Sequence, residues 1–213
     1  MHPWQQTTVG SGLLLHAPLS IGLDPAPLQR EFAALDASVG DEGRMHLAHD
    51  GTWSSITLID RRLATEAERH PAGTPMPALQ AMPSVGRLMD RLGCRIISCY
   101  VHRQAPGGTL RWHYDAQALH LDECRLIVPL HAPPGSVTRI GDVAAAYPDG
   151  TVWTGDFSFP HQVENAPDDQ RIVLLVDARS DDGLRALAPA ALSAHAGRRV
   201  ELSQKAVNAL LNG

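Results

Sequence analysis

The chain has 213 residues, of which 44% are hydrophobic and 19% are charged, so it can bury one core of ordinary size. Its formal net charge of −5 argues against a partner that binds through a nucleic-acid backbone. The 3 cysteines lack CxxC spacing, which argues against a disulfide framework, and no stretch has the pattern of a signal peptide or a membrane span. We therefore expect one cytoplasmic domain over residues 1–213, without a membrane or nucleic-acid partner and with its oligomeric state left open.

Residues 1–77 have the weakest pattern of the chain, and their structure is left uncertain. Apolar residues at helical spacing, Leu28, Phe32 and Leu35, follow Asp24-Pro25 and predict a helix over residues 25–37. Residues 53–59 predict a short strand. The prolines of residues 66–77 indicate an irregular connection.

A core with a preceding helix is expected over residues 78–180. The helix is predicted at 78–92 and ends at Gly93. Six short strands follow, at residues 95–101, 110–114, 125–130, 136–140, 152–154 and 172–177, with proline- and glycine-containing turns between them. Many short strands with frequent turns predict a sandwich or a barrel. The Ala- and Leu-rich residues 181–213 predict two helices broken near Gly197, which would cap the barrel, cover a sheet edge or dimerise.

The segment His113-Tyr114-Asp115 carries the strongest chemical signal. Side chains alternate along an extended strand, so His113 and Asp115 point to one face. His161, which follows an apolar run, supplies a third candidate ligand. Two histidines and one carboxylate form the triad that binds non-haem Fe(II) and leaves coordination positions open.

Arg171 opens the most apolar strand that the sequence predicts, residues 172–177. A guanidinium that leads into a buried strand needs an anion, because an unpaired buried charge is costly. A dicarboxylate would bind its planar fork in a bidentate manner, and a structural ion pair is the alternative.

From about residue 78 to residue 178 the chain resembles the Fe(II)/2-oxoglutarate-dependent oxygenases of the aspartyl/asparaginyl β-hydroxylase group, including bacterial proline-hydroxylase-like members. The ordered elements that carry the resemblance are the helix before the barrel, Pro106-Gly107-Gly108-Thr109-Leu110 before the HxD motif, Arg125 leading into Val128-Pro129-Leu130, Gly155-Asp156 before His161, Asn165 after it, and the strand that Arg171 opens.

The resemblance implies a mainly β fold with flanking helices, a double-stranded β-helix of the jelly-roll or cupin-like type. It implies Fe(II) on His113, Asp115 and His161, and 2-oxoglutarate on Arg171, with Arg125 on the co-substrate side; a salt bridge from Arg125 to a neighbouring acid is the alternative. The animal peptidyl hydroxylases of the group lack the metal carboxylate and have a histidine where this chain has Ile127. Both departures favour the bacterial small-substrate enzymes, and Asp115 favours hydroxylation over halogenation.

Three residues near the motif are candidates for substrate binding. Arg103 would clamp a substrate carboxylate, unless it is only a solvated loop charge. Trp112 and Tyr114 flank the metal ligands and would line the rim of the pocket, with core packing as the alternative, favoured for Trp112.

Three functions follow from this pattern. The first is hydroxylation of an unactivated C–H bond in a free amino acid or small amino-acid derivative, with O2 consumed and succinate and CO2 released. The second is the same chemistry on an Asp, Asn or Pro side chain of a peptide. The third is a metal-binding cupin-like sensor without turnover. A closed pocket favours the first, and an open groove favours the second.

Overall fold

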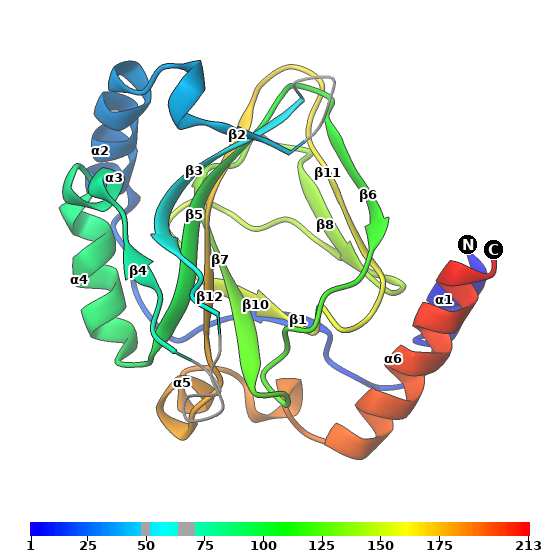
Figure 1. Cartoon of the computed structure of the whole chain (residues 1–213). Helices are drawn as coiled ribbons and strands as arrows, with labels where there is room; N and C mark the ends of the chain where they lie inside the picture. The colour runs from blue at the N-terminus through cyan, green and yellow to red at the C-terminus, as the bar shows by residue number, and fades with distance from the viewer. Residues whose placement is uncertain (48–51, 64–70) are drawn as a thin grey trace.

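The computed structural model describes residues 1–47, 52–63 and 71–213, and two antiparallel sheets form its centre (Figure 1). The larger sheet has the order β1 (His16–Pro18), β10 (Trp153–Gly155), β7 (Glu123–His131), β12 (Arg171–Arg179), β5 (Ile96–Gln104), β3 (Trp53–Asp60) and β2 (Met45–His46), with β4 (Thr74–Pro75) paired to β3. The smaller sheet has the order β6 (Thr109–His113), β11 (His161–Glu164), β8 (Val137–Ile140) and β9 (Val143–Ala145). This is the mainly β, cupin-like architecture that the sequence predicts.

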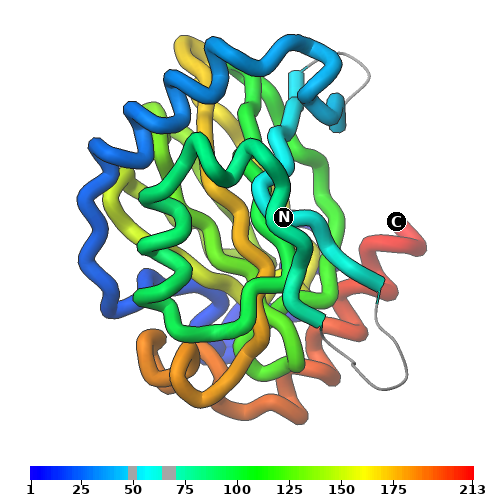
Figure 2. The backbone as a smooth tube through the Cα atoms, turned by 60° about the vertical axis from the view of Figure 1, so that its left-hand side comes forward, coloured from blue at the N-terminus to red at the C-terminus, as the bar shows by residue number. Residues whose placement is uncertain are grey.

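Helices cover the face of the larger sheet that points away from the smaller sheet (Figure 2). They are α2 (Pro25–Ser38), α3 (Pro77–Gln80) and α4 (Pro83–Leu92). The predicted helix at 25–37 is confirmed as α2, and the Asp24 carboxylate caps it by accepting a hydrogen bond from the Ala26 N–H at 3.1 Å. A short 3-10 helix, η1 (Asp41–Gly43), follows.

The single helix predicted over residues 78–92 is wrong in one respect, because the structure divides it into α3 and α4. Pro83 has no N–H to continue the helical hydrogen bonds, and it restricts the residue before it. Met82 accordingly leaves the helical region, with φ −124° and ψ 62°. The predicted end at Gly93 is confirmed, since Gly93 has φ 64° and closes α4 in the left-handed conformation.

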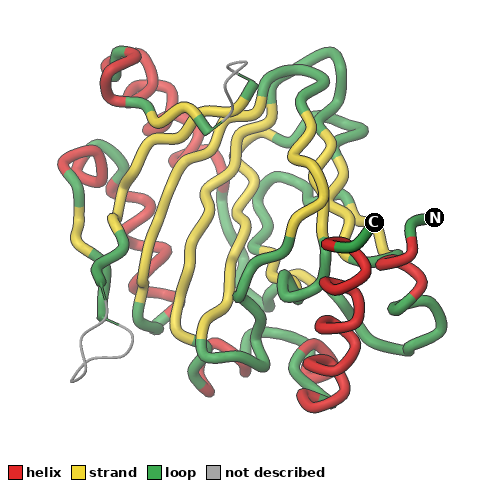
Figure 3. Tube along the Cα trace, turned by 45° about the vertical axis from the view of Figure 1, so that its right-hand side comes forward, coloured by secondary structure: helices red, strands yellow, loops and turns green. Residues whose placement is uncertain are grey.

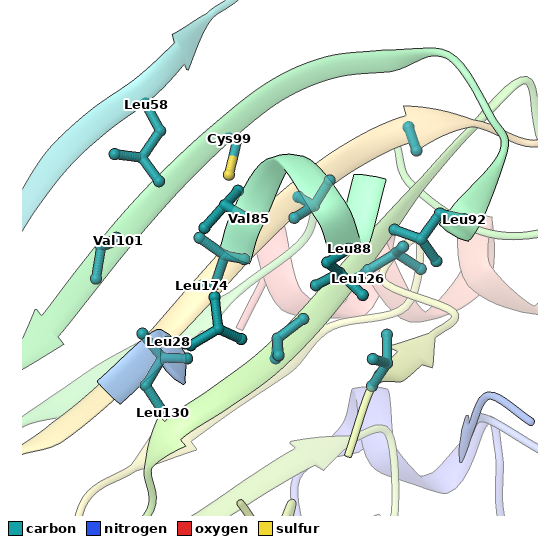
Figure 4. Close-up of a cluster of buried hydrophobic side chains, with 14 of the residues drawn as sticks. Leu28, Leu58, Val85, Leu88, Leu92, Cys99, Val101, Leu126, Leu130 and Leu174 are labelled. Carbon is teal, nitrogen blue, oxygen red and sulfur yellow. The ribbon is translucent and has the colours of Figure 1, made fainter. Parts of the chain in front are cut away.

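The main hydrophobic core lies between these helices and the larger sheet (Figure 4). Leu28 from α2 and Leu88 from α4 are almost fully buried against Leu126 and Leu174 of the sheet. Apolar residues on this side of β12 alternate with residues that face the interior between the two sheets: Ile172, Leu174 and Val176 belong to the core, whereas Arg171, Val173 and Leu175 line the interior cavity. Both faces of β12 are therefore buried.

All the strands predicted from the sequence are present, with shifts of a few residues at their ends. Five others escape the sequence pattern because they are short: β1, β2, β4, β9 and β11. Part of the predicted irregular connection at 66–77 lies outside the described residues; its described end contains β4 and the start of α3. No helix in the described part of the chain has the length and apolar character needed to cross a bilayer.

The C-terminal region forms α5 (Asp182–Ala186), the 3-10 helix η2 (Ala190–Leu192) and α6 (Ala196–Leu211). The predicted break near Gly197 is wrong, because Gly197 lies in the first turn of α6 and the break comes earlier, around Pro189. Helix α6 packs beside α1 (Pro3–Gln6), which brings the two termini together (Figure 3).

One fully buried ion pair ties α6 to the barrel. Arg199 has no solvent exposure, and its Nη1 donates to Asp156 Oδ2 at 2.9 Å. Three further N–H groups of Arg199, on Nε and Nη2, donate to the backbone carbonyls of Leu14, Ala191 and Ala194. Because all of these partners are buried or partly buried, neither charge has access to water in compensation.

We predict that Arg199→Met lowers the free energy of unfolding by about 3–5 kcal/mol, because it leaves Asp156 buried without its partner. Chemical denaturation at pH 7 measures this, with Arg198→Met, at the exposed neighbouring position, as the control. Adding Asp156→Asn should recover part of the loss. An Arg199→Met variant as stable as the wild type would contradict the assignment.

Candidate metal and co-substrate site

Three candidate metal ligands converge at the adjoining ends of β6 and β11. His113 ends β6, His161 begins β11, and the two residues are paired across the strands, with ring centroids 4.0 Å apart. Asp115 lies two residues beyond the end of β6, in a loop and not on the strand that the alternation argument assumes. One ligand atom from each of the three side chains lies within 4.8 Å of the others. The sequence-predicted triad is therefore assembled in space.

Backbone carbonyls select the protonation site on both histidines. His113 Nδ1 lies 2.7 Å from the Arg111 carbonyl oxygen, and His161 Nδ1 lies 3.1 Å from the Phe159 carbonyl oxygen. A carbonyl only accepts, so each Nδ1 donates and each Nε2 keeps its lone pair. Burial, followed by the influence of His113, holds the pKa of His161 well below its ordinary value. His161 therefore offers a neutral Nε2 as a ligand.

Asp115 is held by its backbone and by its carboxylate. Its N–H donates to the Phe157 carbonyl at 2.9 Å, and Phe157 packs edge-on against His161. Its carboxylate accepts from Nη1 of Arg125, which lies on β7 of the larger sheet. This bond crosses from one sheet to the ligand set on the other, so Asp115 is oriented although its loop has no strand partners.

Arg125 is itself fixed by a second carboxylate. Its Nε donates to Asp177 Oδ1 at 2.8 Å and its Nη2 donates to Asp177 Oδ2 at 3.2 Å. Asp177 is buried and also accepts from Ser98 Oγ at 3.0 Å and from Arg61 at 3.3 Å. Arg125 thus pairs with Asp177 and Asp115, neither of which adjoins it in the sequence. Arg125 therefore lies next to the candidate metal carboxylate and restrains its position.

Arg171, the first residue of β12, is 6% exposed and faces the same interior space as the triad. Among the residues that the structure describes, no carboxylate lies within ion-pair distance of it. Burial lowers the pKa of Arg171 to about 10, an effect that nearby Tyr147 partly opposes. The guanidinium remains charged at neutral pH, so it needs an anionic ligand.

A cavity of about 240 Å³ joins the triad to Arg171. Its polar side chains include the three ligands, Arg125, Arg171, His102 and Thr138. The rest of its wall is apolar and comes from both sheets, with Ile127 and Leu175 on the larger sheet and Val163 on the smaller sheet. A site with an open metal face at one position and a cation at another suits an anionic chelating ligand between them.

Arg103, predicted to bind a substrate carboxylate, lies on the other side of the larger sheet. It forms an ion pair with Asp36 of α2, and its guanidinium lies 5.9 Å from the centre of the Phe32 ring. Arg103 is paired with Ile172, and both belong to the sheet face that α2 covers. The neighbour of Arg103 on the strand, His102, is the residue that faces the cavity. The prediction that Arg103 reaches a substrate in this cavity is therefore wrong, because its side chain lies on the opposite face of the sheet.

Trp112 and Tyr114 are likewise absent from the described lining of the cavity. Trp112 packs edge-on against Trp4 of α1, with ring centroids 5.7 Å apart, which agrees with the core-packing alternative. Tyr114 is 44% exposed. Both residues flank the ligands in sequence, but neither lines the cavity with them.

Sequence reasoning did not assign Trp53 or His102 to the site, and both line the cavity. The sheet face that they occupy is buried like the opposite face, so polar and apolar residues do not alternate in the way that reveals orientation. Their place in the site follows from the pairing of β5 with β12 and with β3, which only the structure shows.

The comparison with protein-family models gives a match over residues 27–181 to aspartyl/asparaginyl beta-hydroxylase. The chain belongs to this family. The matched range contains the triad, Arg125 and Arg171 and covers well over half of the chain. It begins within α2 and ends after β12, so it includes the helical layer as well as the two sheets.

Solved structures share the fold. An oxidoreductase of the 2OG-Fe(II) oxygenase family from Burkholderia pseudomallei is 17% identical, with a TM-score of 0.52. The match covers 87% of this chain and 93% of the other chain. A prolyl-4-hydroxylase from Pseudomonas putida is 13% identical, with a TM-score of 0.48, and the match covers 84% of this chain and 99% of the other chain. A viral collagen prolyl hydroxylase from Paramecium Bursaria Chlorella virus-1 is 12% identical, with a TM-score of 0.48, and the match covers 81% of this chain and 98% of the other chain. No curated protein gives a significant match.

The family makes this chain a 2-oxoglutarate-dependent hydroxylase that uses Fe(II) and O2. The residues present fit both groups. Two imidazoles and one carboxylate are the donor set of a non-haem Fe(II) centre, and a buried guanidinium without a carboxylate partner in the described chain suits a dicarboxylate.

We predict that Arg125→Met weakens metal binding by about ten- to a hundred-fold, because Asp115 loses the group that orients it. Calorimetric titration with Co(II) as a redox-stable probe measures the effect. Arg30→Met, on the exposed side of α2, is the control. A variant combining Arg125→Met with Asp177→Asn also removes the buried carboxylate that Arg125 no longer compensates. Unchanged Co(II) affinity in both folded variants would contradict the positioning role.

We also predict that stability falls between pH 7 and pH 5. Burial lowers the pKa of His16 to about 4, so the unfolded chain takes up a proton near pH 6.5 before the folded chain does. Stability from His16 is present above that pH and is lost as the pH falls towards 4, by about 2 kcal/mol at pH 5. Urea unfolding at both pH values measures the loss. His16→Asn should reduce the pH dependence, and an unchanged dependence would contradict this source of it.

Proposed function

We propose that His113, Asp115 and His161 hold the Fe(II) and that Arg171 binds the distal carboxylate of 2-oxoglutarate. The observation that carries this proposal is the buried charge of Arg171, which faces the same cavity as the triad and lacks a carboxylate partner among the described residues. A bidentate carboxylate would compensate that charge and satisfy its donors together.

The substrate proposed for this site is a free amino acid or a small amino-acid derivative, which is hydroxylated at an unactivated C–H bond. A cavity of about 240 Å³ supports a small substrate, or one side chain, beside the co-substrate. The family argues against the sensor alternative, in which the barrel binds a metal without turnover. The three cysteines are free, which suits a reducing compartment, and we propose that the protein acts in the cytoplasm.

Each side chain of the site has a separate task in this proposal. His113 and His161 would bind through Nε2, because their Nδ1 atoms face backbone carbonyls. Arg125 holds the Asp115 carboxylate in position, and Arg171 anchors and orients the co-substrate. Apolar residues such as Phe157 and Val163 exclude water from the reacting atoms. Bound Fe(II) supplies the redox chemistry by which O2 converts 2-oxoglutarate to succinate and CO2 and a C–H bond to an alcohol.

We predict that Arg171→Met raises the dissociation constant of 2-oxoglutarate by about 100-fold or more, because the anion loses its buried partner. Anaerobic titration of the metal-loaded protein measures binding, and succinate release in air measures turnover. Arg30→Met should bind as the wild type does, and His161→Ala should lose turnover. Full 2-oxoglutarate affinity in folded Arg171→Met would overturn the co-substrate assignment.

A further inference from the structure

A tryptophan and a histidine form a hydrogen-bonded pair on the wall of the cavity. Trp53 lies on β3 and His102 lies on β5, both in the larger sheet, whereas the metal ligands come from β6, β11 and the loop after β6. The Trp53 indole Nε1–H donates to His102 Nδ1 at 3.2 Å. The ring centroids are 5.6 Å apart and the ring planes meet at 76°, so the indole restrains the orientation of the imidazole ring.

This hydrogen bond determines which nitrogen of His102 carries the proton. An indole N–H only donates, so Nδ1 accepts and the proton of the neutral ring lies on Nε2. Burial lowers the pKa of His102 to about 3, and the charges of Arg125 and Arg171 act in the same direction. His102 is therefore an uncharged N–H donor at neutral pH, and no described residue accepts a hydrogen bond from its Nε2.

The two guanidinium groups at the cavity already have tasks. Arg125 is held by Asp115 and Asp177, and Arg171 is assigned to the co-substrate. The walls beside the pair are apolar, with Leu47 after β2 and Leu110 on β6. A neutral donor suits an uncharged oxygen acceptor, because both guanidinium groups whose charges reach His102 are already engaged, and a carboxylate there would lose hydration without gaining a cation of its own.

We propose that His102 is a specificity-determining residue whose Nε2–H binds a carbonyl oxygen of the substrate, with Trp53 holding it and covering the substrate's aliphatic part. The substrate class is then a small amino-acid derivative whose carboxyl group is an amide. This inference rests on the proposed function and narrows its substrate.

The experiment compares free L-proline and L-leucine with L-prolinamide, L-leucinamide and their N-acetyl amides as stimulants of succinate release. We expect amides to stimulate more strongly than the matching free acids. His102→Phe should raise the KM for the best amide by about ten-fold, with kcat and the KM for 2-oxoglutarate little changed. His102→Gln, which keeps an N–H donor, should recover part of the loss.

Three results would overturn the inference: stimulation by the free acids in preference to the amides, no stimulation by any amide, or an effect of His102→Phe on the KM for 2-oxoglutarate in place of the KM for the amide. Thermal unfolding of both His102 variants establishes that they fold. Failure of the proposed function has a different signature, because the metal-loaded wild type would then not bind 2-oxoglutarate at all.

Discussion

Strand β12 is buried on both faces, and the alternation of its side chains organises the rest of the molecule. Ile172, Leu174 and Val176 pack under the helices, while the residues between them face the cavity. Arg171 at the start of the strand and Asp177 near its end are therefore placed on the interior side by the same periodicity that builds the core. A shift of one residue in its pairing would turn Ile172, Leu174 and Val176 towards the cavity and place Arg171 and Asp177 on the face that the helices cover.

The interior charges are arranged so that each has a defined task. Asp177 fixes Arg125, and Arg125 reaches the carboxylate of Asp115 on the opposite side of the cavity. This chain of ion pairs connects the rigid larger sheet to a ligand that lies in a loop. Arg171 differs from it, because its charge is uncompensated within the described protein. The contrast between a satisfied guanidinium and an unsatisfied one separates a positioning residue from a binding residue.

The sequence predicted the architecture and the metal triad, but it could not predict orientation within the larger sheet. The sequence reveals His113, Asp115 and His161 because their residue types are those of a known metal triad. It reveals the strands because proline- and glycine-containing turns mark where they end. Because both faces of β5 are covered, periodicity does not say whether Arg103 or His102 meets the cavity. The partners of Arg125 were missed because Asp177 is distant in sequence and adjacent only through strand pairing. Pro83 is a local signal for the break between α3 and α4, but the apolar residues of 78–92 keep helical spacing across it and so predict one helix.

The central claim is that one cavity holds a metal on the triad and a dicarboxylate on Arg171. Anomalous X-ray diffraction at the iron absorption edge, from crystals prepared anaerobically with Fe(II) and 2-oxoglutarate, tests it directly. The account predicts one iron peak bounded by His113 Nε2, Asp115 and His161 Nε2, with the distal carboxylate of 2-oxoglutarate paired to the Arg171 guanidinium. An iron peak elsewhere, or 2-oxoglutarate bound without contact to Arg171, would contradict it.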